Sequence, residues 1–390
     1  MSAEFQITAA ASFSAFTRDE WETLPGTKRA TPGYNPFISH AYLSAMEHSG
    51  SAIAKTGWAP RHLRMEDANG KLLGAVPCYA KSHSQGEYVF DHGWADAYAR
   101  AGGDYYPKLQ ATVPFTPATG PRLLAGTPEL KAILGQGLSS LCAETNSSSV
   151  HVTFADQSDV ELLETEGWLH RTDQQFHFID RGYADFAGFL ASLASRKRKD
   201  LRKEREKALE NGITIEWLTG SAITSEALDA FFQFYIDTGN RKWGRPYLTK
   251  AFFTLVTETM AEDVLLIMAK RNGRYVAGAI NFIGADALFG RHWGAIENHP
   301  FLHFEVCYYQ AIDFALSHGL ARVEAGAQGE HKLARGYEPV TTHSAHFIRH
   351  QGLRNAVAEY LERERRDIAQ VGEMLAEHTP FRKGSKEIAD

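Results

Sequence analysis

The sequence predicts a mixed α/β protein, of the α+β class, in which two tandem domains each form a twisted mixed sheet flanked by helices. The chain of 390 residues is longer than a domain with a single hydrophobic core usually is, so we expect two domains. Asn69-Gly70 and Asn272-Gly273 each separate two apolar runs, which is typical of a β-hairpin. Gly167-Trp168 and Gly336-Tyr337 are each followed, after eight residues, by His-Phe-Ile. Because both motifs occur twice in the same order, we favour a duplication over the chance recurrence of short motifs.

The order of these motifs sets the expected domain boundaries. The N-terminal domain covers residues 1–185 and carries an insertion rich in aromatic residues and glycine between Tyr88 and Phe115. The aromatic side chains of this insertion either cover a core or form the wall of a site for a long apolar ligand. A basic linker helix covers 186–212, the C-terminal domain covers 213–350, and 351–390 form an amphipathic helix and a tail. Such a helix packs on its own protein, with membrane contact as the alternative.

Net charge and cysteine usage limit the partners that we expect. The formal charge of −6 gives no global attraction to nucleic acid or anionic lipid, so DNA is not an expected partner. Cys78, Cys142 and Cys307 lack zinc-ligand spacing, and we expect free thiols and no metal. The N-terminus lacks the features of a secretion signal, and no apolar run reaches the length of a membrane span. We expect a cytoplasmic protein, with peripheral contact at the inner face of the membrane left open.

Three stretches could bind an anion. Residues 195–207 carry eight basic side chains against three acidic ones, Arg196 and Arg198 among them, on a predicted helix. This helix is either a solvated linker or a site for a phosphorylated substrate or an acidic membrane surface. A loop of small residues with Thr119, Gly120 and Arg122 precedes a helix predicted from about 128 to 144, and its backbone N–H groups suit a phosphate. The third stretch is a cationic aromatic cluster that begins with Arg241-Lys242.

The region around residue 310 has a distinct pattern of elements. An apolar helix is predicted for 304–317, and Gly319 suits its C-terminal end. A strand is predicted for 321–325, and a polar stretch then leads to a second strand that ends at Ile348.

Several stretches of the sequence resemble the FemAB-like group of predicted N-acyltransferases, which belongs to the GNAT superfamily and is often labelled as peptidoglycan biosynthesis or recognition. The resemblance covers about residues 35–350 and implies two tandem GNAT-like acyltransferase domains. Upstream, it includes residues 56–63, 113–122 and 241–247. In the C-terminal half it rests on Arg291-His-Trp-Gly, Leu302-His-Phe-Glu, Cys307-Tyr-Tyr-Gln and Glu324-Ala-Gly-Ala-Gln-Gly-Glu-His-Lys.

The resemblance implies an enzyme with an activated acyl donor. Proteins resembling FemA and FemX add amino acids from aminoacyl-tRNA to a peptidoglycan precursor, whereas other acyltransferases near this group transfer a long acyl chain from acyl-CoA to a sphingoid base. The sequence lacks the long charged coiled-coil arm of some FemA-type proteins, and its net charge is negative. We therefore expect acyl-CoA as co-substrate and a small or lipid-like amine, a sphingoid base, as acceptor. Aminoacyl-tRNA is the less favoured donor, and a non-catalytic binding module is the third hypothesis.

N-acyl transfer requires a neutral amine, a firmly held carbonyl, a donor to the developing oxyanion and a proton for the leaving group. GNAT-like domains splay two central strands and use backbone amides for much of this work. The resemblance implies Glu324, Glu330 or His331 as acceptor of the amine proton and Tyr308 as proton donor. Each has an ordinary alternative, since Glu330 and His331 could cap a short helix, Glu324 could pair with Arg291 or Arg335, and Tyr308 could belong to the core.

The residues expected to bind the donor share a basic side chain, a loop backbone or a place near a helix start. His303 and Glu305 flank the start of the helix that would face phosphate. The complete set of these candidates is Thr119, Gly120, Arg122, Arg196, Arg198, Arg241, Lys242, His303 and Glu305.

Overall fold

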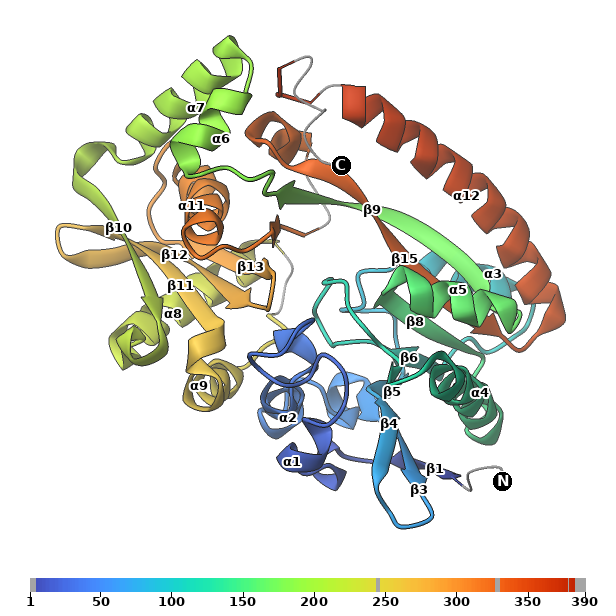
Figure 1. Cartoon of the computed structure of the whole chain (residues 1–390). Coiled ribbons are helices and arrows are strands. Elements are labelled where there is room, and N and C mark those ends of the chain that lie inside the picture. The colour runs from blue at the N-terminus through green and yellow to red at the C-terminus, as the bar shows by residue number, and fades with distance from the viewer. Residues whose placement is uncertain (1–4, 243–245, 327–329, 378, 383–390) are drawn as a thin grey trace. The chain divides into compact units, whose positions relative to one another are not determined.

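The computed structural model describes residues 5–242, 246–326, 330–377 and 379–382, without the side chains of 240–242, 330 and 376–377. It divides into two compact units (Figure 1). Unit 1 consists of Met1–Asp173 and Thr341–Gln370, and unit 2 of Gln174–Val340 and Val371–Asp390. These units are not the continuous segments expected from the sequence, because β9 (Leu169–Ile179) and β15 (Glu338–Ile348) each pass from one unit to the other. That the segments 1–185, 186–212, 213–350 and 351–390 act as domains stays a prediction.

Unit 1 combines two groups of strands with helices on an apolar core. In the first, the order is β1-β3-β4-β7, and in the second the C-terminal part of β15 is followed by β8, β6, β5 and β2. The first group consists of β1 (Phe5–Ala10), β3 (His62–Asp67), β4 (Leu72–Val76) and β7 (Leu124–Ala125). The second includes β2 (Trp58–Pro60), β5 (Cys78–Lys81), β6 (Lys108–Ala111) and β8 (Ser149–Ala155). The helices are α1 (Arg18–Trp21), α2 (His40–His48), α3 (His92–Arg100), α4 (Pro128–Glu144) and α5 (Gln157–Thr165).

Unit 2 is built on strands in the order β10-β11-β12-β13-β14-β9. Helices α8 and α11 both pack against β13, and in Figure 1 α6 and α7 lie beside α11. The strands are β10 (Ile213–Thr219), β11 (Val264–Arg271), β12 (Arg274–Ile283), β13 (Ala287–Ala295) and β14 (Arg322–Glu324). The helices are α6 (Phe186–Ser192), α7 (Ser195–Ala208), α8 (Ser225–Lys242), α9 (Lys250–Thr259), α10 (Leu302–Phe304) and α11 (Gln310–Ser317). Helix α12 (Gln351–Glu377) begins in unit 1 and ends in unit 2.

The two repeated motifs take the same structure in both halves of the chain. Asn69-Gly70 and Asn272-Gly273 connect the antiparallel pairs β3–β4 and β11–β12. Gly167 and Gly336 both have a positive φ, of 85° and 87°, a conformation that glycine adopts without steric cost. Each precedes a strand of eleven residues, β9 or β15, that ends in His-Phe-Ile. The predicted hairpins and the mixed α/β class are confirmed.

The aromatic insertion of unit 1 contributes to a core. Trp94 and Tyr105 lie in one buried cluster with Leu353, Val357 and Leu361 of α12. The amphipathic helix thus packs on its own chain over these turns, and these two aromatic side chains cover a core. Phe90, from the same insertion, is 59% exposed.

Candidate active site

Strands β13 and β14 of unit 2 separate after a short parallel contact. Only Ala287, Leu288 and Phe289 of β13 pair with Arg322, Val323 and Glu324 of β14, and β13 then continues to Ala295. Beside the separation, β13 carries a β-bulge, since Ile280 of β12 pairs with His292 and Asn281 pairs with Gly290, which leaves Arg291 as the extra residue. Bulges re-aim side chains and interrupt the ladder, and they are common next to active sites. The short contact and the bulge support a splay in unit 2, which stays a prediction.

The helical segment that follows β13 is also irregular. Phe301 has a φ of 62°, in the left-handed region that non-glycine residues avoid, and α10 starts at the next residue. The segment Glu305–Tyr309 is a π-helix between α10 and α11. Single π-helical turns are frequently found at functional sites. The predicted helix 304–317 is therefore present, but its first turns are not regular α-helix.

A cavity of about 120 Å³ lies where these elements meet, and we call it the wedge cavity. A second cavity of about 590 Å³ is lined in part by Trp293 and His303, which also line the wedge cavity, so the two adjoin. The wedge cavity is lined by Ala279, Asn281, Gly290, Arg291, His292, Trp293, His303, Cys307, Tyr308 and Ala325.

Tyr308 and His331 form the one pair of predicted catalytic residues that the described side chains bring together. The Tyr308 hydroxyl lies 3.0 Å from Nε2 of His331. Burial raises the pKa of Tyr308, which keeps the phenol protonated. Burial of part of the imidazole and the positive charge of Arg335 lower the pKa of His331, which favours the neutral ring. A protonated phenol beside a neutral imidazole suits proton transfer between an amine and a leaving group.

Lys332 was not among the predicted residues, although it directly follows His331. Its ammonium group is buried and donates hydrogen bonds to the carbonyl oxygens of Ala325 and Gly326, at 2.6 and 2.9 Å. Burial lowers the pKa of Lys332 to about 8. The lysine therefore holds the turn after β14, whose residue Ala325 lines the wedge cavity. The only sequence signal was its place in the stretch 324–332.

Glu324 lies at the end of β14 and contacts Arg322 and His177. Its carboxylate accepts a hydrogen bond from Nε of Arg322 at 3.0 Å and lies 3.8 Å from Nε2 of His177. The expectation of a pair with Arg291 or Arg335 is wrong for Arg335, whose guanidinium pairs with Glu204 instead. Glu330 starts the 3-10 helix Glu330–Arg335, but its side chain lies outside the described residues. The catalytic role of each of these residues stays a prediction.

The expected donor-binding residues are spread over both units. His303 lines both cavities, whereas Glu305 is fully buried and pairs with Arg205 of α7 at 2.8 Å. Arg196 is exposed and Arg198 is half-buried on α7. Arg241 and Lys242 end α8, and their side chains lie outside the described residues. Ligand binding by these residues stays a prediction.

In unit 1, the loop with Thr119, Gly120 and Arg122 is used internally. The Gly120 N–H donates to the carbonyl of Phe154, and the carbonyl of Thr119 accepts from Asn35. The buried guanidinium of Arg122 donates to four backbone carbonyls, among them Thr153 at 3.0 Å and Ala118 at 2.6 Å. Thr127, not this loop, caps α4. The geometry indicates a structural role for Arg122, and phosphate binding by the loop stays a prediction.

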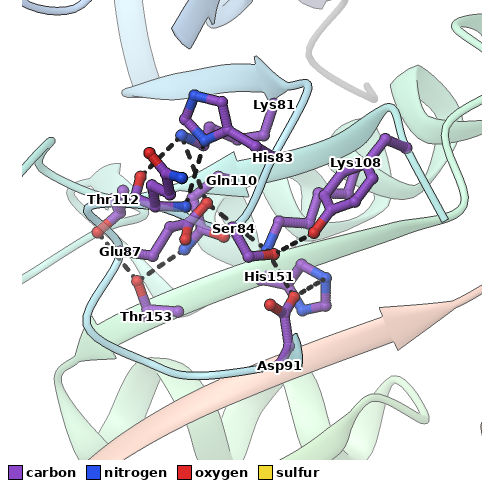
Figure 2. A network of polar contacts seen from close by, with 12 residues as sticks. Lys81, His83, Ser84, Glu87, Asp91, Lys108, Gln110, Thr112, His151 and Thr153 are labelled. Carbon is purple, nitrogen blue, oxygen red and sulfur yellow. Dashed lines mark hydrogen bonds and ion pairs between the residues drawn. The ribbon is translucent and has the colours of Figure 1, made fainter. Parts of the chain in front are cut away.

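A network of buried polar side chains occupies the matching region of unit 1, where β6 and β8 pair in parallel (Figure 2). The Nζ atom of Lys108 donates to Oδ2 of Asp91 at 2.5 Å and to Oγ of Ser84 at 2.8 Å. Thr153 of β8 accepts from Gln110 of β6 at 2.9 Å. Fully buried charges of this kind persist only when they are paired. Polar side chains therefore occupy this part of unit 1, and in unit 2 a cavity lies at the end of the parallel pair.

Among the side chains that the structure describes, no group of three or more histidine, cysteine, aspartate or glutamate residues is arranged to hold a metal ion. None of the helices traced in residues 5–382 has the length and apolarity needed to cross a bilayer.

Several solved structures are similar to this chain. The fold resembles that of FemX, with a TM-score of 0.54, 11% identity, and coverage of 91% of this chain and 100% of FemX. L-PGS from Bacillus licheniformis gives a TM-score of 0.49 at 11% identity over 82% of this chain and 95% of that one. The C-terminal domain of a putative lysylphosphatidylglycerol synthetase from Agrobacterium fabrum gives 0.46 at 11% identity over 67% and 83%. No curated protein matches the sequence.

The class of protein is an acyl- or aminoacyl-transferase, as predicted. The chain belongs to the FemAB-like family, described as peptidoglycan biosynthesis/recognition, and matches it over residues 12–383.

Proposed function

We propose that the chain transfers an aminoacyl group from the 3′ end of an aminoacyl-tRNA to the amine of a cell-wall precursor, with the reaction in the wedge cavity of unit 2. The observation that carries this proposal is the cavity at the parting of β13 and β14, lined by Tyr308 next to His331. The family description favours this reaction over ceramide formation, and no comparison supports a sphingoid-base acceptor.

The size of the wedge cavity also supports a small acyl group. It encloses about 120 Å³, whereas sites for drug-sized ligands span roughly 300–1,000 Å³. A long acyl chain would have to extend into the adjoining cavity of about 590 Å³, whose lining includes Asp237 and Glu297. Carboxylates do not suit an apolar chain. Acyl-CoA as donor therefore becomes the second candidate.

In this proposal the side chains carry one proton from the amine to the leaving group. The neutral amine attacks the ester carbonyl carbon, and its excess proton goes to the free ring nitrogen of His331. The Nε2–H of His331 passes to the Tyr308 oxygen as the Tyr308 proton passes to the departing ribose oxygen, so that the amide forms and the C–O ester bond breaks. In this proposal backbone N–H groups next to the bulge at Arg291 stabilise the oxyanion.

The experiment is a product assay with two donors. Purified protein is incubated with aminoacyl-tRNA or with acyl-CoA, and with either a peptidoglycan-precursor peptide amine or a sphingoid base, and amide products are identified by mass spectrometry. We expect an aminoacyl-peptide product from the RNA-borne donor. Product only from acyl-CoA and sphingoid base would replace the proposal by the second candidate, and no amide with any pair would contradict both.

A further inference from the structure

Helix α7 presents a concave basic surface next to the wedge. A cavity of about 330 Å³, which we call the basic groove, is lined by Lys197, Lys203 and Lys207 of α7 and by Arg335, against two carboxylates, Asp200 and Glu204. One of these carboxylates, Glu204, is already paired with Arg335 at 2.9 Å. The groove therefore has an excess of positive charge in a chain whose net charge is −6.

The floor of the basic groove is apolar and partly aromatic. It is lined by Leu201, Ala334 and Phe301, the residue held in the left-handed backbone region. Strained backbone of this kind is found at sites that clamp ligands. A groove lined by both an aromatic ring and ammonium groups suits a chain in which phosphates alternate with flat bases.

The basic groove and the wedge cavity are lined by residues that lie two positions apart in the sequence. Phe301 lines the basic groove, and His303 lines the wedge cavity. Helix α7 is also fixed to the π-helical turn, because Arg205 pairs with Glu305 at 2.8 Å and with Asp313 at 2.8 Å. A ligand bound along α7 therefore lies at a fixed position relative to Tyr308.

From these contacts we infer that the basic groove binds the phosphate-ribose chain of the RNA that bears the aminoacyl group, an inference that rests on the proposed function. Lys197 and Lys207 are about 15 Å apart along the helix axis, which spans several phosphates instead of one. An acidic membrane surface fits less well, since the exposed residues of α7 include no apolar side chain to enter a bilayer.

The test compares two double variants that lose the same charge from the same helix. Lys197→Ala/Lys203→Ala removes two lysines of the groove, and Lys199→Ala/Arg202→Ala removes two cations that do not line it. Binding of a fluorescent RNA hairpin with a single-stranded 3′ end is measured by anisotropy at several salt concentrations. We expect the groove variant to lose at least about tenfold in affinity and to show a salt slope smaller by about 1.4, because each of the two lost phosphate contacts removes about 0.7. The control variant should lose less than about threefold.

Equal losses in the two variants would overturn the inference, and so would tight binding to anionic vesicles without binding to RNA. Competition by coenzyme A at equal strength would assign the groove to a thioester donor instead. The product assay separates the two proposals. If the groove variant still forms amide from aminoacyl-tRNA at the wild-type KM, the inference that the basic groove binds RNA is wrong and the proposed function stands. If no variant and no wild-type protein forms amide, the proposed function fails.

Discussion

At the scale of single residues, the account depends on Tyr308 and His331. Tyr308→Phe keeps the buried ring and removes the hydroxyl that contacts His331 at 3.0 Å. Loss of one proton-transfer group costs about 10²–10⁴ in rate, so we expect kcat to fall by at least about 100-fold with the unfolding temperature unchanged. Steady-state kinetics with calorimetry check this, and a variant with full turnover would remove Tyr308 from the site.

The protonation of His331 gives a pH dependence. Because the pKa of His331 is lowered from 6.5, its neutral, proton-accepting form persists below that pH. Because the reaction also requires a neutral amine, kcat/KM is divided by the fraction of neutral amine at each pH. We expect this corrected kcat/KM to fall only at a pH below 6.5 in the wild type, and this acid limb to vanish together with most activity in His331→Asn. If the residual activity of His331→Asn still falls at the same acid pH, the ionisation would belong to another group, for example His303.

Lys81 provides a stability prediction in unit 1. Burial lowers the pKa of Lys81 to about 7, although Glu87 opposes the shift. Between about pH 7 and 10.5 the unfolded chain binds a proton that the folded protein lacks, so the free energy of unfolding should rise with pH, by up to ~1.4 kcal/mol per unit. Below about pH 7, Lys81 is protonated in both the folded and the unfolded protein, so its contribution to the free energy of unfolding no longer changes with pH. Urea unfolding at several pH values should show this rise in the wild type and in the exposed-lysine control Lys199→Met, but not in Lys81→Met.

At the scale of elements, the sequence was most informative where a pattern is local. The helix predicted from about 128 to 144 matches α4, and both Asn-Gly hairpins are present, since turn chemistry and caps act within a few residues. The bulge at Arg291 and the π-helix at Glu305 could not be predicted, because they depend on strand register and on partners such as Arg205, which lies 100 positions before Glu305. The same holds for Lys332, whose partners are backbone carbonyls after β14.

The contact between α7 and the π-helical turn gives a prediction at this scale. Arg205→Met leaves the fully buried carboxylate of Glu305 without its guanidinium partner. Breaking a buried pair costs about 3–5 kcal/mol, and because Arg205 is one-fifth exposed we expect about 3 kcal/mol. The double variant Arg205→Met/Glu305→Gln should recover part of that stability in chemical denaturation. If the double variant is less stable by the sum of both single losses, the pair is not coupled.

At the scale of the whole molecule, the main features are the motifs repeated in both halves of the chain and the differences between those halves. The repeated motifs in the sequence predicted two related halves, but not the exchange of β9 and β15 between compact units, because strand pairing over long separations leaves no local trace. Nor did the sequence say which half reacts, since both contain a parallel strand pair. The two regions differ in their side chains, which form a buried polar network in unit 1 and line a cavity in unit 2.

This difference predicts where activity resides. Gln110→Met removes the hydrogen bond to Thr153 in unit 1 and should lower stability by about 1–3 kcal/mol while kcat stays within about twofold of the wild type. Turnover and unfolding measured on the same preparation check the separation. A loss of kcat as large as that of Tyr308→Phe would place the reaction in unit 1.

The most direct test of the account fills the wedge cavity. Gly290 lines it, and a Cβ at that position would meet Asn281 at 3.4 Å and Glu324 at 3.5 Å, which are ordinary contacts. Gly290→Val should therefore fold normally yet lose at least about 100-fold in amide formation, because the acyl group no longer fits. Gly126→Val, at a glycine with no atom within 4 Å of its added Cβ, is the matched control. Full activity in a folded Gly290→Val protein would contradict the claim that the acyl group is held between β13 and β14.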